Sequence, residues 1–186
     1  MIDFRQAHPD GWLVTMDELS LYFQASLTRV WYPKGQTPVV RISPQRDHQH
    51  FYGALNLITG QEVALSLPAL SADNTIHFLQ HLLDCLPSHP ILLLLDRAPW
   101  HKACPVQEFI AQQSRLEVVF FPPACPDLNP QEHVWKQARQ AVSHNHTFPD
   151  FPALCQAFRA FLDCTVFRFD WFMQIVPSVL RQFLLV

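Results

Sequence analysis

Residues 118–132 read Val-Val-Phe-Phe-Pro-Pro-Ala-Cys-Pro-Asp-Leu-Asn-Pro-Gln-Glu and form the most constrained segment of the chain. The apolar residues 118–121 are typical of a strand. Four prolines lie between positions 122 and 130, and they exclude helix and central strand because proline lacks the backbone N–H that both structures need. The segment ends at Glu132, in the first turn of a predicted amphipathic helix. A stiff loop therefore fixes one carboxylate beside the end of a strand.

Two further acidic residues also follow apolar runs. Asp96 ends the run Ile91–Leu95, and Asp17 follows residues 12–16. Three acids at the ends of three buried elements suggest a divalent-metal site, because Mg²⁺ and Mn²⁺ prefer carboxylate oxygens. Two such ions roughly 4 Å apart can hold the attacking and leaving oxygens of a phosphoryl displacement. The alternative is that each acid only caps a turn or faces solvent, with Glu132 favouring the positive end of a helix dipole. The spacing alone does not separate these interpretations.

The composition is that of a single globular domain. The chain has 186 residues, of which 49% are hydrophobic and 16% are charged, enough for a substantial core. No apolar run is long enough to span a bilayer, and the N-terminus lacks the features of a signal peptide. Five widely spaced cysteines without a Cys-x-x-Cys pair argue against a disulfide framework and a zinc site. We therefore expect a soluble, cytoplasmic protein without membrane partners.

The net charge of −3 bears on nucleic-acid binding. A protein that binds nucleic acid by itself is usually basic, because much of the affinity comes from neutralising phosphates. Either this chain does not hold nucleic acid alone, or a basic partner or a missing domain supplies most of the affinity.

The order of apolar patterns predicts strands first and helices later. Residues 51–58 and 62–67 are predicted strands of a hairpin that turns at Gly60. Ile91–Leu95 has no polar alternation, as expected of a strand covered on both faces. The remaining predicted elements are a strand at 118–121, an extended run at 37–43 and helices at 71–86, 103–113, 131–143 and 150–163. This order predicts an α/β fold in which helices flank a mixed sheet, antiparallel at first and parallel later. That layout is similar to the ribonuclease-H fold.

Two segments carry a more specific resemblance. Residues 95–101, Leu-Asp-Arg-Ala-Pro-Trp-His, and residues 121–135, Phe-Pro-Pro-Ala-Cys-Pro-Asp-Leu-Asn-Pro-Gln-Glu-His-Val-Trp, resemble the catalytic half of the DDE transposases. They are most similar to the insertion sequence 630 family, the bacterial branch of the mariner superfamily. That family has Asp-Asn-x-x-x-His after one strand and Pro-Pro-Tyr-Ser-Pro-x-Leu-Asn-Pro-x-Glu-x-x-Trp after the next. Asp17-Glu18 matches its first motif, and residues 31–38 resemble its Trp-x-x-x-Gly turn. The resemblance covers roughly residues 10–165.

The resemblance implies a ribonuclease-H-like catalytic domain that cuts and joins DNA by two-metal phosphoryl transfer. The implied catalytic residues, which are also the ligands of two Mg²⁺ or Mn²⁺ ions, are Asp17, Asp96 and Glu132. The implied partners are transposon-end and target DNA, with a homodimer in the DNA-bound state and a location at the bacterial nucleoid. Contacts with DNA are expected from Arg97, His101 and His133. For His101, orienting the site and a hydrogen bond within its loop are the alternatives.

The departures from the family pattern leave a second hypothesis open. Arg97 replaces the usual Asn, and Ala124 and Cys125 stand where Tyr and Ser are usual. Relatives also carry an N-terminal helix-turn-helix domain that is expected to be absent here, so residues 1–186 are interpreted as one DDE catalytic domain. A separate helix-turn-helix subunit could then supply recognition of DNA. The alternative is a non-catalytic or domesticated remnant that acts as a DNA- or protein-binding module.

Overall fold

The computed structural model describes residues 2–24, 28–29, 31–37, 39, 45–86, 88–123 and 128–169. Its strands are β1 (Trp12–Tyr22), β2 (His48–Asn56), β3 (Glu62–Leu67), β4 (Ile91–Leu95) and β5 (Leu116–Phe120). Its helices are α1 (Ile2–Ala7), α2 (Ala72–Cys85), α3 (Cys104–Ala111), α4 (Pro130–Ala138), the π-helical turn η2 (Arg139–Ser143) and α5 (Phe151–Cys164). No helix in the described ranges has the length and apolar character needed to cross a bilayer.

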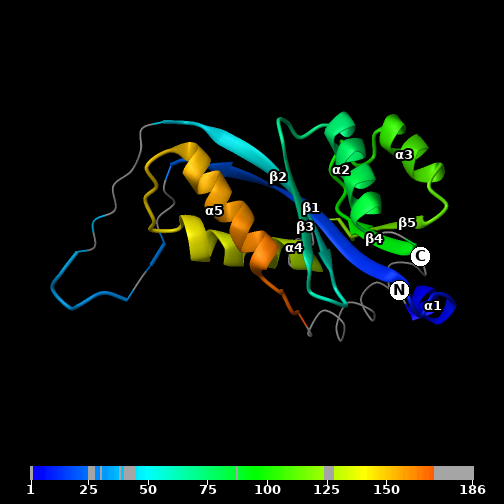
Figure 1. The fold of residues 1–186 in the computed structure, drawn as a ribbon, viewed down its shortest axis with the longest axis horizontal. Helices are drawn as coiled ribbons and strands as arrows, with labels where there is room; N and C mark the ends of the chain where they lie inside the picture. The colour runs from blue at the N-terminus through cyan, green and yellow to red at the C-terminus, as the bar shows by residue number, and fades with distance from the viewer. Residues whose placement is uncertain are drawn as a thin grey trace.

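The five strands form one mixed sheet in the order β3-β2-β1-β4-β5. β1 lies in the middle, antiparallel to β2 and parallel to β4. β2 and β3 pair antiparallel as the predicted hairpin, and β4 and β5 pair parallel. Helices α2 and α3 lie on one face of the sheet, and α4 and α5 lie on the other (Figure 1). The predicted α/β fold, with helices flanking a sheet that is antiparallel first and parallel later, is confirmed.

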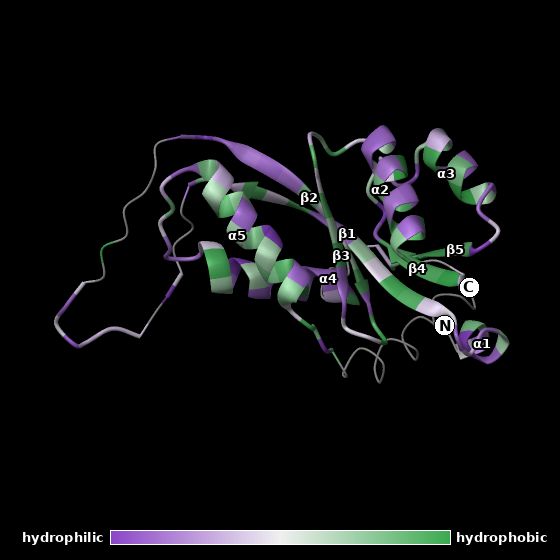
Figure 2. Cartoon of the chain, in the orientation of Figure 1, coloured by the Kyte–Doolittle hydropathy of each residue, from purple (hydrophilic) through white to green (hydrophobic). Residues whose placement is uncertain are grey.

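The two faces of the sheet have separate hydrophobic cores. Alternate residues of β1, such as Val14 and Met16, face α2 and α3, whereas Leu19 and Leu21 face α4 and α5. β4 is buried along its whole length because both of its faces are covered. Figure 2 shows β4 as hydrophobic from end to end. The absence of polar alternation in its sequence is thereby explained.

One difference from the sequence-based expectation concerns β1. The prediction placed Asp17 at the end of a strand, but β1 continues to Tyr22 because residues 17–22 pair with β2. The neighbouring strand β4 pairs with β1 only as far as Thr15. Asp17 therefore lies in the middle of its strand, just beyond the point where β4 ends. Beyond Thr15, the residues that the structure describes place no strand beside β1 on the β4 side.

Helix α4 starts where the proline-rich segment predicts. Asn129 caps the helix, and its side chain accepts a hydrogen bond from the backbone N–H of Gln131 at 3.1 Å. Pro130 occupies the first helical turn, where its missing N–H costs nothing. Trp135 is only 3% exposed and packs in the core formed with α5. Residues 124–127, which include Ala124 and Cys125, and most of the predicted extended run at 37–43 lie outside the described residues.

Gly53 of β2 allows α4 to approach the sheet closely. Gly53 lies opposite Asp17 in the sheet. A Cβ atom at this position would overlap Glu62 Oε1 and the ring of Trp135, and would lie 2.6 Å from Gln131 Nε2. The bare backbone of Gly53 therefore forms the surface on which the first turns of α4 rest.

The substitution Gly53→Ala is expected to lower the free energy of unfolding by about 1–3 kcal/mol, because overpacking forces α4 away from the sheet. Chemical denaturation measures the change. The control Ser66→Ala, at an exposed position of β3, should stay within about 0.5 kcal/mol of the original protein. Equal stability of Gly53→Ala and the control would show that α4 does not depend on this contact.

Candidate functional site

The three predicted acids come from β1, the end of β4 and the first turn of α4. Asp17 is on the face of β1 that α4 covers. It lies opposite Gly53 in the sheet, and its side chain is on the same side of the strand as that of Leu19, two residues later. Asp96 directly follows β4, and Glu132 is in the first turn of α4. The charges of Glu132 and Asp96 both act on Asp17. The structure thus brings the three carboxylates within electrostatic reach of one another.

Asp17 is the member of this group whose ionised form is most disfavoured. It is 9% exposed, and burial raises the pKa of its carboxyl well above the ordinary value. The neighbouring carboxylates of Glu18, Glu132 and Asp96 raise the pKa of Asp17 further, because each adds negative charge nearby. A charge in such a place needs either a proton or a cation.

The pKa of Asp96 is shifted in the opposite direction to that of Asp17. Burial alone would raise the pKa of Asp96, but hydrogen bonds from His101 and from the N–H of Ala98 outweigh burial and bring the pKa below its ordinary value. Both bonds go to Oδ1, at 2.7 Å from His101 Nδ1 and 3.0 Å from the Ala98 nitrogen. The side chain is 47% exposed. Asp96 is therefore ionised, oriented and accessible.

His101 connects the loop after β4 to β1. It is fully buried, with Nδ1 2.7 Å from Asp96 Oδ1 and Nε2 2.7 Å from Glu18 Oε1. Burial alone would lower the pKa of His101, but the hydrogen bonds to Asp96 and Glu18 raise it to about 10. The imidazolium therefore donates both N–H groups to carboxylates at neutral pH. This placement favours the alternative that His101 orients the site over the prediction that it contacts DNA.

Arg97 and His133, the other two predicted DNA contacts, lie closer to the surface. Arg97 is exposed, donates from Nε to the carbonyl oxygen of Phe121 at 3.0 Å, and places its guanidinium 6.0 Å from the centroid of the Phe120 ring. His133 is half-buried, with its ring centroid 5.6 Å from that of Phe169. Contact with DNA stays a prediction for both.

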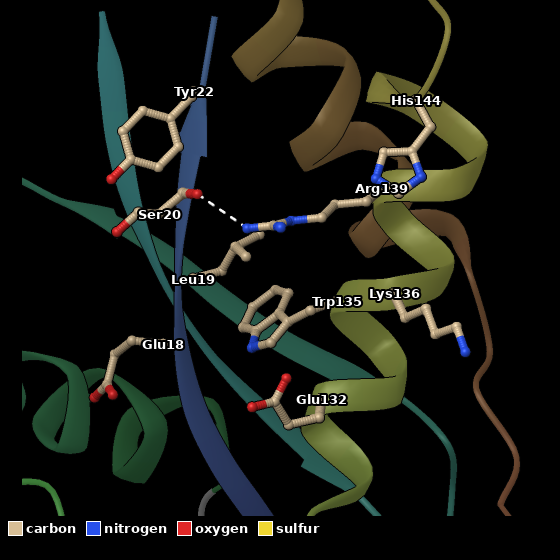
Figure 3. Close-up of a pocket in the computed structure, with 9 residues that line it drawn as sticks. All are labelled: Glu18, Leu19, Ser20, Tyr22, Glu132, Trp135, Lys136, Arg139 and His144. Carbon is tan, nitrogen blue, oxygen red and sulfur yellow. Dashed lines mark hydrogen bonds between the residues drawn. The ribbon is translucent and has the colours of Figure 1, made fainter. Parts of the chain in front are cut away.

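A cavity of about 430 Å³ lies along β1 beyond Thr15, between α4 and the side of β1 on which the described residues place no strand. Figure 3 shows Glu132 and Trp135 pointing from α4 toward β1. The lining residues are Glu18, Leu19, Ser20, Tyr22, Glu132, Trp135, Lys136, Arg139 and His144. We call this cavity the β1 edge cleft.

The β1 edge cleft brings cations close to Glu132. Arg139 donates from Nη2 to the carbonyl oxygen of Ser20 at 3.1 Å, as the dashed line in Figure 3 shows. Burial lowers the pKa of Arg139, and the charge of Glu132 partly restores it. Lys136, one helical turn after Glu132, is exposed. The cleft therefore combines an acidic end with a basic wall.

The sequence interpretation missed three polar residues of this region. Glu18 was taken only as part of a motif, although the two-residue period of a strand predicts that it points away from Asp17, toward the side of His101. Arg139 follows Glu132 by seven residues, a helical spacing that predicts a shared face. Glu62 has no signal of this kind, because it approaches α4 from a different strand.

The three carboxylates have the ligand chemistry that a hard divalent cation needs, but they are not close enough together to share one ion. Carboxylate oxygens are the ligands that Mg²⁺ and Mn²⁺ prefer, and a cation would relieve the repulsion that raises the pKa of Asp17. Within the described ranges, however, no three His, Cys, Asp or Glu side chains stand close enough to form a metal-binding group. The carboxylates would have to converge further to share an ion.

In the presence of a metal chelator, Asp17→Asn is expected to raise the free energy of unfolding at pH 8. The folded-state pKa of Asp17 is raised, so its contribution to stability is present below the unfolded pKa of about 4 and is lost as the pH rises through the folded value. Each unit of pKa difference corresponds to about 1.4 kcal/mol. Denaturation at pH 4 and pH 8 measures the gain, which should appear only at the higher pH.

The control for this substitution is Asp10→Asn, at an exposed position, which should change stability by less than about 0.5 kcal/mol at either pH. A loss of stability in Asp17→Asn at pH 8 would show that Asp17 is not repelled by its neighbours.

Comparison with known sequences identifies a family and several relatives of this chain. The profile of the DDE superfamily endonucleases matches residues 12–155. The insertion element IS630 uncharacterized 39 kDa protein of Shigella sonnei is 22% identical over 148 residues, which cover 79% of this chain and 43% of that protein. The uncharacterized protein y4pE/y4sA of Sinorhizobium fredii strain NGR234 is 32% identical over 76 residues, which cover 39% of this chain and 53% of that protein. The matched regions thus span about half of these relatives.

The fold is also that of solved transposase structures. The Mos1 transposase paired-end complex with left transposon end superposes with a TM-score of 0.66 at 18% identity, over 82% of this chain and 48% of that chain. The Mos1 mariner paired-end complex with Mn gives a TM-score of 0.64 at 18% identity, over the same shares of the two chains. The catalytic domain of Mos1 mariner transposase gives 0.59 at 16% identity, over 82% of this chain and 70% of that one. The predicted ribonuclease-H-like fold is confirmed, and the chain belongs to the DDE superfamily endonucleases.

Proposed function

We propose that this chain cuts and joins DNA by metal-dependent phosphoryl transfer, as the catalytic part of a transposase. The observation that carries the proposal is the electrostatic convergence of Glu132 and Asp96 on the buried Asp17, within the region that matches the endonuclease family. Structures of Mos1 with Mn and with Mg are similar to this chain in fold, which supports a divalent cation as the cofactor. Two ions, Mg²⁺ or Mn²⁺, are proposed.

In this mechanism the metal ligands would be Asp17, Asp96 and Glu132. When bound, the ions would activate a water or a 3′-hydroxyl and stabilise the charge on the departing oxygen. The remaining task of the chain is positioning. His101 fixes Asp96 through Oδ1 and is itself held by Glu18.

Nucleic acid is the proposed ligand of the β1 edge cleft. The cleft begins at Glu132 and is lined by Lys136 and Arg139, and such cations neutralise phosphates. Arg97 is exposed next to Asp96 and is proposed to contact a phosphate on the other side of the acids. Because the whole chain carries a net charge of −3, we propose that a second subunit or domain of helix-turn-helix type supplies most of the affinity. Two catalytic chains are proposed to act together on DNA in the bacterial nucleoid.

The proposed reaction predicts nicking of DNA that requires Mg²⁺ or Mn²⁺. Asp96→Asn and Glu132→Gln are each expected to lower the nicking rate by at least 100-fold, since each removes one charged ligand while keeping the size of the side chain. Supercoiled plasmid or a fluorescent oligonucleotide duplex reports the nicking. Glu108→Gln, at an exposed position of α3, is the matched control and should nick at the original rate.

Metal binding separates this proposal from the remnant hypothesis. Calorimetric titration with Mn²⁺ should give binding that Asp17→Asn, Asp96→Asn and Glu132→Gln each weaken. Cleavage that persists without metal would refute the assignment. Failure of Mn²⁺ to bind, together with the absence of nicking, would favour a non-catalytic binding module.

The β1 edge cleft predicts the salt dependence of DNA binding. Lys136→Ala is expected to weaken binding to any duplex and to reduce the slope of log affinity against log salt by about 1, as for the loss of one phosphate contact. Fluorescence anisotropy at several salt concentrations measures the slope. Arg159→Ala removes a partly exposed cation of α5 that pairs with Asp163, and this control should leave the slope unchanged. If both variants keep the original slope, the cleft is not the path of the DNA.

A further inference from the structure

Glu62 is the acidic residue of this region that the proposed mechanism does not use. It is the first residue of β3, the edge strand, and its carboxyl group reaches under the first turn of α4. There Gln131 Nε2 donates a hydrogen bond to Glu62 Oε1 at 2.5 Å. Gln131 is fully buried, and Glu62 Oε1 lies against the bare backbone of Gly53.

Two oxygen atoms of this pair have no hydrogen-bond partner. They are Glu62 Oε2 and Gln131 Oε1, both inaccessible to solvent and without a partner in the described part of the chain. An ionised Glu62 could satisfy neither of them, because both atoms are acceptors. A neutral Glu62 carries a proton on Oε2 and becomes a donor, and Gln131 Oε1 is an open acceptor on the side chain that Glu62 already holds. One proton would therefore satisfy both atoms.

The charges around Glu62 also favour the neutral form. Among the described residues, Asp17 on β1 acts electrostatically on Glu62, and an adjacent cavity of about 230 Å³ is also lined by Cys85, Asp163 and Cys164. None of these four groups is a cation, and the cation beside them, Arg159, is paired with Asp163. Burial raises the pKa of Glu62 well above its ordinary value, the hydrogen bond from Gln131 lowers it, and Asp17 raises it again. No hydrogen bond joins Glu62 to Asp17 in the described residues.

The pair lies directly behind Glu132. Gln131 immediately precedes Glu132 in the first turn of α4, and that turn rests on Gly53. A side chain locked by two hydrogen bonds cannot rotate freely, so the backbone that carries it is held as well. Small displacements of such a turn would move the Glu132 carboxylate relative to Asp17.

We propose that neutral Glu62 is a positioning residue, which forms a reciprocal acid–amide pair with Gln131 and thereby fixes the helical turn that presents Glu132. The proposal rests on the proposed function for its catalytic consequence, whereas the pair itself is a statement about the fold. Glu62 does not bind metal in this scheme. It acts only through Gln131 and α4.

The first test is structural and needs no activity. Difference infrared spectroscopy of the wild-type protein against Glu62→Gln should show the carbonyl band of one protonated, buried carboxylic acid at pH 8. Hydrogen exchange measured by mass spectrometry should show faster exchange in residues 130–138 for Glu62→Ala. Glu62→Gln keeps an amide that can pair with Gln131 and should retain slow exchange. A carboxylate band in place of the acid band would overturn the proposal.

The second test uses a reciprocal exchange of the two side chains. In the double variant Glu62→Gln with Gln131→Glu, the acid and the amide change places and the pair can form again. We expect Glu62→Ala to lower kcat for nicking at saturating Mn²⁺ by at least 10-fold with little change in KM for DNA. Gln131→Glu alone should also have a lower kcat, because the variant places a second acid against Glu62. The double variant should recover to within about 3-fold of the original kcat. Glu117→Gln, at an exposed position of β5, is the control.

The outcomes separate this inference from the proposed function. If the wild-type protein does not nick DNA but shows the acid band and the protected turn, the proposed function fails and the pair stands. If the wild-type protein nicks DNA but Glu62→Gln loses activity and Mn²⁺ affinity to the same extent as Glu62→Ala, Glu62 is a charged ligand and the positioning role is wrong. A double variant no better than Gln131→Glu alone would also overturn the proposal.

Discussion

The repulsion among the carboxylates around Asp17 is the constraint on which the rest of the structure depends. Asp17 is buried in the middle of β1, and the negative charges of Glu18, Glu132 and Asp96 all act on it. Such a cluster destabilises the folded chain unless other groups hold it in place. The surrounding polar contacts serve this purpose, with His101 neutralising Glu18 and Asp96 on one side and Arg139 facing Glu132 on the other. Stability is given up locally where this negative charge is concentrated.

The acids are held by two different kinds of restraint. Asp96 is fixed by direct hydrogen bonds from His101 and the Ala98 N–H. Glu132 is exposed and is fixed indirectly, through the Asn129 cap, the buried Trp135 and the close approach of α4 to Gly53. The first restraint acts on a side chain, and the second acts on a whole helix. Displacement of α4 would therefore change the site without altering any of the acids.

The sequence predicted the fold better than it predicted the surroundings of the three acids. Residues 91–95 and the 51–67 hairpin have patterns that depend only on neighbours in the chain, so their strands were predicted correctly. The extent of β1 was not, because the pairing of residues 17–22 depends on the register of β2, which no local pattern encodes. For the same reason the contact of Glu62 with Gln131, 69 residues apart, has no sequence signal. The metal and DNA roles of the predicted residues stay predictions.

In the described part of the chain, the β4 side of β1 beyond Thr15 leaves main-chain N–H and C=O groups without a neighbouring strand. Such an edge is a template on which another chain can add a strand, and many proteins aggregate through edges of this kind. Here the guanidinium group of Arg139 donates a hydrogen bond to the Ser20 carbonyl oxygen, and α4 lies beside this edge. The same residue that lends positive charge to the cleft thus also blocks one position of unwanted strand addition. Loss of the Arg139 side chain would therefore both free the Ser20 carbonyl and remove positive charge from the cleft.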